Sequence, residues 1–159
     1  MTPETLCSGP GKAETEGEET MTKTEISSLI RDALAVRQQA YAPYSGFYVG
    51  AVLLCTDGSV YAGCNVENAS YPAGNCAERT AVFKAVSEGK RDFQAICIVG
   101  GPEGKAEDFC PPCGICRQVL AEFGDPDSFQ VILAKNEEEY RIFTLGDLLP
   151  FSFGKIQLT

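Results

Sequence analysis

The sequence predicts an α/β protein in which helices pack on a five-stranded mixed sheet. Helical and strand patterns alternate along the 159 residues in the order helix, strand, strand, helix, strand, helix, strand, strand, which is typical of a sheet covered by helices. From the second to the fourth strand a helix separates each strand from the next, so we expect parallel crossovers in this stretch. The length agrees with one domain that buries about 70% of the surface of its unfolded chain.

The first predicted helix begins at Thr22, because Thr22-x-x-Glu25 resembles a capping box. We expect Pro43 to end it. Residues 1–21 are Gly-rich and hold five Glu against one Lys, which predicts a disordered acidic tail before a domain over residues 22–159. The helix has one apolar face, formed by residues at helical spacing: Ile26, Leu29, Ile30, Ala33 and Leu34.

A β-hairpin follows this helix. The segment Phe47–Cys55 is rich in strand-forming residues, and Thr56-Asp57-Gly58 is a turn signal. Residues Ser59–Val66 are therefore predicted to be the return strand, and Glu67–Asn75 a loop.

The next elements are a helix and a central strand. The helix is predicted from about Cys76 to Ser87 and closed by Gly89. The continuous apolar run Phe93–Val99 is typical of a strand buried on both faces.

The last part of the chain begins with a Gly- and Pro-rich loop over Gly100–Pro112. A third helix is predicted over Gly114–Phe123 and ends at Gly124. The remaining predicted elements are two strands and one helical turn: Phe129–Ala134, Tyr140–Phe143 and Asp147–Leu149.

The composition excludes several kinds of active site. The chain has eight Cys and no His, so it cannot form a Ser-His-Asp triad, a Cys-His pair or an HExxH zinc site. A metal would have to be held by thiolates or carboxylates, and acid–base chemistry falls to Asp or Glu. Eight cysteines, with no apolar stretch in the first twenty residues, indicate a reducing compartment, so we expect a cytoplasmic protein.

Charge and hydropathy limit the partners. The 13 Lys+Arg and 22 Asp+Glu residues give a net charge of −9, and two basic residues are adjacent only at Lys90-Arg91. We therefore expect no nucleic acid polymer as a partner. The longest apolar run, Val49–Cys55, is far shorter than the roughly 20 residues of a membrane-spanning helix, so we expect no membrane association.

Three cysteines, Cys76, Cys113 and Cys116, fall at the starts of predicted helices. A helix N-terminus stabilises the thiolate, which is the form that binds metals. The spacing Cys113-x-x-Cys116 is common in zinc sites, and parallel crossovers can bring Cys76 to the same edge of the sheet as a third ligand. Three ligands leave the fourth zinc position open, which is typical of a catalytic site.

Glu78 lies two residues after Cys76, in the first turn of the same predicted helix. A carboxylate there could reach a water on the zinc without ligating the metal, and could move the protons of that water. The pattern Cys76-Ala77-Glu78, followed by Pro112-Cys113-Gly114-Ile115-Cys116, resembles the zinc deaminase signature in its three-cysteine form.

Four blocks lie between about Tyr41 and Phe153 in this order: YAPYSGFYVGA, GCNVENASYPAGNCAERTA, PCGICRQVLAEFG and LLPFSF. Together they resemble the small cytidine deaminases that act on free nucleosides. The resemblance implies a three-layer αβα fold and one Zn²⁺ per subunit. It also implies hydrolytic deamination of cytidine and deoxycytidine to uridine and deoxyuridine, with release of ammonia, as in pyrimidine salvage. The assembly it implies is a homotetramer with active sites at subunit interfaces.

The resemblance also assigns roles to individual residues. The implied zinc ligands are Cys76, Cys113 and Cys116, the proton carrier is Glu78, and Arg79 donates hydrogen bonds to the ligand thiolates. The implied substrate contacts are Asn65 and Glu67 for the ribose hydroxyls, Phe47 for the face of the pyrimidine, the backbone near Ala77 and Pro111 for the edge of the base, and Phe153 from a neighbouring subunit, with Tyr71 near that interface.

Several positions leave alternatives open. Cys110-x-x-Cys113-x-x-Cys116 also resembles an iron–sulfur run, which with Cys76 would form a closed, non-enzymatic metal site. A second alternative is the same chemistry on a polynucleotide, against which the acidic charge argues. Phe47 could be an ordinary core residue, while Asn65 and Glu67 could cap a loop. The departures from the family pattern are Cys110-Pro111, Phe151 and Asn75.

Overall fold

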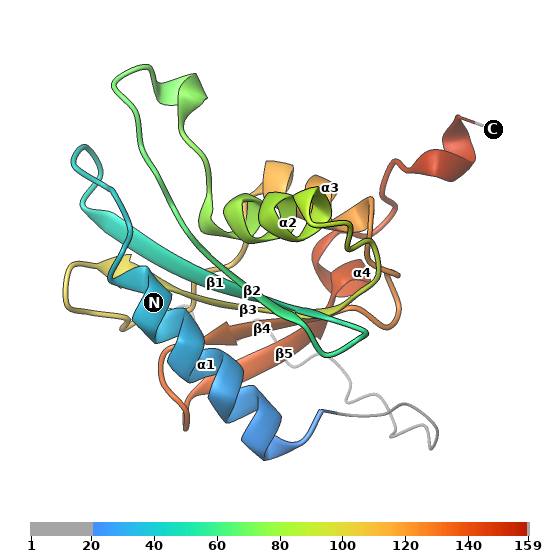
Figure 1. Ribbon diagram of the computed structural model, residues 1–159, viewed down its shortest axis with the longest axis horizontal. Coiled ribbons are helices and arrows are strands. Elements are labelled where there is room, and N and C mark those ends of the chain that lie inside the picture. Colours follow the sequence, from blue (N-terminus) through green and yellow to red (C-terminus); the bar gives the residue numbers. More distant parts are fainter. Residues whose placement is uncertain (1–20, 159) are drawn as a thin grey trace, which may run out of the picture.

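Five strands form one mixed sheet at the centre of the computed structural model, which describes residues 21–158 (Figure 1). Their order across the sheet is β2-β1-β3-β4-β5. Strand β3 pairs in parallel with β4, and the other neighbouring pairs are antiparallel. The strands are β1 (Phe47–Cys55), β2 (Val60–Cys64), β3 (Phe93–Pro102), β4 (Gln130–Ala134) and β5 (Tyr140–Thr144).

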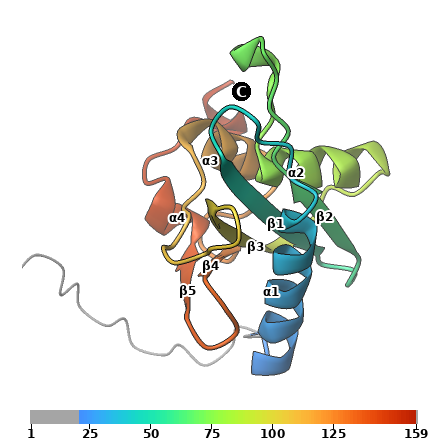
Figure 2. The same ribbon diagram turned by 90° about the vertical axis from the view of Figure 1, so that its left-hand side faces the viewer.

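Helices cover both faces of this sheet, which confirms the expected three-layer fold. Helix α1 (Lys23–Arg37) lies on one face, and α2 (Ala77–Ser87) and α3 (Gly114–Ala121) lie on the other (Figures 1 and 2). A short helix, α4 (Leu145–Leu148), packs beside α3. Two 3-10 turns complete the described chain, η1 (Tyr71–Ala73) and η2 (Lys155–Gln157). None of the helices in residues 21–158 combines the length and apolar character that a membrane span requires.

The parallel crossovers predicted from the sequence are present. Strands β2 and β3 are both antiparallel to β1, so they run in the same direction and α2 connects them. Helix α3 connects β3 to its parallel neighbour β4. Both helices therefore begin on the same side of the molecule, and this brings their N-termini together.

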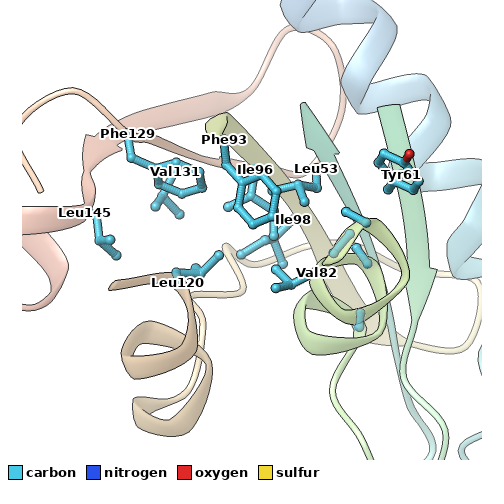
Figure 3. Close-up of a cluster of buried hydrophobic side chains, with 14 of the residues drawn as sticks. Leu53, Tyr61, Val82, Phe93, Ile96, Ile98, Leu120, Phe129, Val131 and Leu145 are labelled. Atoms are coloured by element: carbon cyan, nitrogen blue, oxygen red, sulfur yellow. The ribbon is translucent and has the colours of Figure 1, made fainter. Parts of the chain in front are cut away.

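The alternation of side chains along the strands builds two cores. On β1, Leu53 points into the layer under α2 and α3, while Val52 points toward α1. On β3, Ile96 and Ile98 join the first layer and Cys97 the second. Figure 3 shows the first core, in which side chains of the sheet meet those of the helices.

The capping box predicted at the start of α1 is present. The Thr22 N–H donates to the Glu25 carboxylate at 2.7 Å, and the Glu25 N–H donates to the Thr22 hydroxyl at 3.2 Å. Met21, the only described residue of the expected tail over 1–21, is buried in the core beneath α1. The rest of that tail lies outside the described residues.

Two predicted boundaries are wrong by three residues or more, and the other boundaries differ by at most two. Helix α1 ends at Arg37, well before Pro43, because the chain turns and the Tyr41 N–H donates to the Asn65 carbonyl at 3.0 Å. Strand β3 continues through Gly100 to Pro102, which the sequence assigned to a loop, because these residues pair with the first residues of β1. Both differences come from long-range pairing that outweighs local glycine and proline signals.

Candidate active site

Two helix starts bring three cysteines together. Cys76 is the N-cap of α2, Cys113 is the N-cap of α3, and Cys116 lies in the first turn of α3. Their Sγ atoms all lie within 4.8 Å of one another, and those of Cys76 and Cys113 are 3.9 Å apart. Sulfur ligands about 2.3 Å from a tetrahedral zinc lie about 3.8 Å apart. The spacing of the three thiols therefore fits one zinc ion with a further position left open.

Close packing of α2 on the sheet fixes the position of Cys76. Gly63 of β2 lies directly beneath the helix, and a Cβ atom added there would lie 2.6 Å from the Ala77 carbonyl oxygen and 2.5 Å from the Ala81 nitrogen. Only a residue without a side chain allows this approach. The first turn of α2 is thus held against β2.

The charges around the three thiols favour a bound cation. The pKa of Cys76 is lowered to about 5, chiefly because the Cys116 thiol donates to its thiolate, and also because Arg79 does. The pKa of Cys116 is raised because its proton is held in this hydrogen bond and because the thiol is buried. Without a cation, ionisation of Cys76 therefore opposes ionisation of Cys116. A divalent metal would supply the charge that lets all three thiols ionise.

Arg79, which the resemblance places next to the ligand thiolates, lies beside the thiols. Its Nη2 donates to the Cys76 Sγ at 3.4 Å, and the charge of this thiolate raises the pKa of the guanidinium. Within the described residues its buried Nε has no hydrogen-bond partner. The guanidinium is thus directed at the sulfur cluster.

Glu78 is buried in the first turn of α2, with a relative exposure of 5%. Burial raises the pKa of its carboxyl to about 7. A carboxyl group with this pKa can both take up and release a proton near neutral pH. It is the only carboxylate among the buried residues of the described chain.

A cleft of about 470 Å³ opens beside Cys76. Its volume falls within the usual range of small-molecule sites. The loop that carries η1 forms one side of it and stands out from the body of the molecule (Figures 1 and 2). The residues that line it include Tyr44, Ser45, Asn65, Glu67, Asn68, Tyr71, Asn75 and Arg79.

Asn65 and Glu67 line this cleft and also hold neighbouring backbone in place. The Asn65 Oδ1 accepts from the Val49 N–H, and its Nδ2 donates to the Phe47 carbonyl, both at 2.8 Å. The Glu67 carboxylate accepts from the Tyr44 N–H at 2.9 Å, from the Ser45 N–H at 3.2 Å and from the Ser45 hydroxyl. Loop capping is therefore observed, yet each side chain keeps a donor or acceptor position that these bonds do not use.

Phe47 and Cys110 pack against the same glycine of β3. A Cβ atom added at Gly100 would lie 2.7 Å from the Cys110 Sγ and 3.2 Å from the Phe47 Cε1. Phe47 is 41% exposed and is not among the residues that line the 470 Å³ cleft. Cys110 is outside the group of three thiols that the described residues form, and burial raises its pKa to about 12. The four-sulfur alternative is thus not formed.

Phe153 lies outside the cleft of its own chain. Its side chain is 58% exposed, and its carbonyl accepts from the Gln118 amide at 2.9 Å. Tyr71, at the rim of the cleft, is 76% exposed. Phe151 is fully exposed and has a positive φ of 57°. A single chain therefore does not bring Phe153 to the site predicted for it.

Two arginines near the site were missed or left aside at the sequence level. Arg37 is buried and donates only to backbone carbonyls. Its burial could have been predicted, because it lies one turn after Ala33 on the apolar face of α1. Arg117 donates to the Pro112 and Leu148 carbonyls, each at 2.7 Å, which agrees with a structural role.

Comparison with known proteins decides the family. The family model described as the cytidine and deoxycytidylate deaminase zinc-binding region matches residues 23–132. The chain belongs to this family. A cytidine deaminase of Sporosarcina psychrophila is 47% identical over 135 residues, which are 85% of this chain and 96% of the relative. One of Halalkalibacterium halodurans is 50% identical over 125 residues, 79% of this chain and 91% of the relative.

Solved structures of cytidine deaminases have the same fold. That of Burkholderia pseudomallei has a TM-score of 0.71 and 50% identity, over 79% of this chain and 97% of the other. That of Mycobacterium tuberculosis has a TM-score of 0.66 and 41% identity, over 80% of this chain and 95% of the other. These matches confirm the predicted class, a zinc-dependent hydrolytic deaminase of the cytidine deaminase type.

Proposed function

We propose that this chain deaminates free cytidine and deoxycytidine by hydrolysis, giving uridine or deoxyuridine and ammonia in pyrimidine salvage. The observation that carries the proposal is the buried Glu78 beside three thiols that fit one zinc ion, next to a cleft of about 470 Å³. The relatives named above are cytidine deaminases of nearly the same length as the matched part of this chain.

Cys76, Cys113 and Cys116 would hold one Zn²⁺ per subunit. When bound, zinc with three protein ligands supplies a Lewis acid that lowers the pKa of water toward 7. Three thiolates on a divalent cation leave a net charge of −1. Arg79, which donates to the Cys76 Sγ, offsets part of that charge and orients the sulfur.

Glu78 moves the protons of the reaction. Its carboxylate takes one proton from the water that attacks C4 of the pyrimidine and delivers it to N3. It then takes the remaining proton from the new C4 hydroxyl and passes it to the amino group, which leaves as ammonia as the C4 carbonyl forms. A buried carboxyl with a pKa of about 7 is suited to both directions of transfer.

In this proposal the nucleoside is held by groups from β1, from the loop after β2 and from the start of α2. Asn65 and Glu67 face the cleft with hydrogen-bonding positions left for the ribose hydroxyls. The Ala77 N–H belongs to the first turn of α2, where N–H groups have no acceptor within the helix, and is available to the base. Phe47 packs against the face of the pyrimidine, and the backbone near Pro111 contacts its edge. A carboxylate at the sugar site disfavours a phosphate, so we infer that nucleic acid polymers are not substrates.

The active unit in this proposal is a homotetramer. Large apolar side chains are exposed at the rim of the cleft, at the start of α3 and along the C-terminal segment, and burying them between subunits would remove this surface from water. In that assembly Phe153 enters the site of a neighbouring subunit, near its Tyr71. The exposed apolar side chains are Tyr44, Val66, Tyr71, Ile115, Phe151, Phe153, Ile156 and Leu158.

We also infer a domain over residues 22–159 after a short acidic tail, and a cytoplasmic location. The cysteines of the described chain are all free thiols, which suits a reducing compartment.

The proposal is tested by following the loss of cytidine absorbance with purified protein before and after treatment with a zinc chelator. We expect turnover that the chelator abolishes and added zinc restores. A parallel reaction with a cytosine-containing oligonucleotide should show no product. Unchanged cytidine in the zinc-loaded sample would refute the proposal.

A further inference from the structure

Arg37, the last residue of α1, is a buried cation with a relative exposure of 4%. No carboxylate pairs with it among the ion pairs of residues 21–158. Its guanidinium instead donates to four backbone carbonyls. Nε donates to Tyr48 at 2.9 Å, and Nη2 donates to Gly101 at 2.9 Å, to Lys105 at 2.6 Å and to Pro102.

Three of these carbonyls, those of Tyr48, Gly101 and Pro102, belong to the last pairs of the ladder between β1 and β3. Tyr48 pairs with Gly101, and the next pair is Phe47 with Pro102. Arg37 therefore joins the two strands at the end where Phe47 begins β1. Phe47 lies one pair beyond Tyr48, so a change in the guanidinium bonds acts on the backbone that orients its ring.

The same guanidinium holds the start of the loop that leads to the zinc ligands. The Lys105 carbonyl lies so close to Gly101 that an added Cβ there would be 2.2 Å from its oxygen. From Lys105 the chain runs to Cys110, which packs against Gly100 beside the Phe47 ring, and then to Cys113. Two segments meet at Gly100, the start of β1 with Phe47 and the loop with Cys110. Each of them begins next to backbone that Arg37 binds.

Helix α1 gives Arg37 little freedom to move. A Cβ atom added at Gly50 of β1 would lie 2.1 Å from the Ala33 carbonyl oxygen and 2.8 Å from the Arg37 nitrogen. The last turn of α1 therefore lies directly on β1. The guanidinium extends from this fixed base to the strand ends.

An arginine suits this task better than other residues. Burying a cation without a counter-ion costs free energy, and burial lowers the pKa of this guanidinium. If the side chain only filled space, an apolar residue would do so at a lower cost in free energy. The planar guanidinium offers five N–H donors in a fixed arrangement, whereas lysine offers one compact charge. Only the guanidinium can hold carbonyls of two strands and a loop together.

We propose that Arg37 is a positioning residue of the substrate site, which fixes the paired ends of β1 and β3 and through them the Phe47 ring. This inference rests on the proposed function, in which Phe47 packs against the pyrimidine. Such packing is made equally in the ground state and the transition state, so its loss should raise KM and leave kcat nearly unchanged.

The kinetic test compares wild type with Arg37→Lys and Arg37→Met. Arg91→Met is the matched control, because Arg91 also donates to backbone carbonyls but precedes the opposite end of β3. We expect KM for cytidine to rise about tenfold in both Arg37 variants with kcat within about twofold, and the control to keep its KM. Lower thermal stability with an unchanged KM in Arg37→Lys would overturn the proposal.

A second readout does not depend on turnover. The chain has no tryptophan, so Phe47→Trp introduces a single fluorescent reporter at the site of interest. We expect Arg37→Lys in this background to shift the emission of the introduced tryptophan to longer wavelength and to increase its quenching by acrylamide, while Arg91→Met leaves both unchanged. Emission and quenching that stay the same when Arg37→Lys is added would refute the positioning role. If the zinc-loaded wild type does not turn over cytidine, the proposed function fails, and the reporter alone decides the role of Arg37.

Discussion

Gly63→Ala is expected to damage the fold and the active site together, because α2 lies directly on this residue of β2. The added methyl group would be 2.5 Å from the Ala81 nitrogen and 2.6 Å from the Ala77 carbonyl oxygen. Ordinary van der Waals contact begins at 3.4 Å. Both neighbours are backbone atoms, so α2 has to move away from β2 by about 1 Å to relieve the clash.

The size of the effect on stability follows from two opposing terms. Overpacking of this kind costs about 1–3 kcal/mol in the free energy of unfolding. Alanine also lowers the conformational entropy of the unfolded chain, which stabilises the folded state by only about 0.4–1 kcal/mol. The clash therefore prevails, and the melting temperature should fall by about 5 °C. The same shift moves Ala77 and Glu78, and a displacement of about 1 Å at such groups can lower kcat/KM by up to about 100-fold.

Calorimetry of wild type and variant at equal subunit concentration measures the loss of stability, and cytidine kinetics measure the loss of function. Gly154→Ala is the control for stability, because the nearest atom to its added Cβ is 3.8 Å away and its φ of −150° suits alanine. A melting temperature of Gly63→Ala within about 1 °C of wild type would refute the reasoning, since 1 kcal/mol corresponds to about 2–4 °C in a chain of this size.

Three further changes have defined outcomes. Arg117→Met leaves the Pro112 and Leu148 carbonyls without their donor and should lower the free energy of unfolding by about 2–3 kcal/mol, as measured by urea denaturation; an unchanged midpoint would contradict this. Lys90 and Ser59 hold the pKa of Asp57 well below its ordinary value of 3.8, so the stability difference between wild type and Asp57→Asn should be complete above that pH and shrink as the pH falls below it; a difference that grows in acid would be the contrary result. Burial raises the pKa of the Cys97 thiol to about 12, so mass spectrometry should find Cys97 unmodified by iodoacetamide in the native protein at about pH 8 and modified after unfolding, and rapid native labelling would refute the burial of this thiol.

Local signals in the sequence predicted much of the fold. The Thr22 capping box, the Asp57-Gly58 turn and the apolar run of β3 each act within a few residues, and each is present in the structure. The zinc site could also be predicted from the sequence, because Cys76 and Cys113 mark helix starts and the crossover rule brings these starts together. Predictions succeeded where a local pattern and a general rule of topology were sufficient.

The remaining features depend on contacts between distant segments. Nothing near Arg37 indicates that its guanidinium binds carbonyls more than sixty residues away in the chain. The extension of β3 to Pro102 requires pairing with Phe47, which outweighs the local glycine and proline signal. The double use of Glu67, which fastens the loop at Ser45 and also lines the cleft, becomes visible only in three dimensions.

The central claim is that three cysteines hold zinc while Glu78 moves protons, and one paired measurement on Glu78→Gln tests it most directly. Glutamine keeps the shape of the side chain but cannot accept and release the proton. Metal analysis and cytidine turnover on the same preparation should find about one zinc per chain, as in wild type, with kcat lowered by about 100- to 10,000-fold. Full zinc content together with wild-type turnover would contradict the claim.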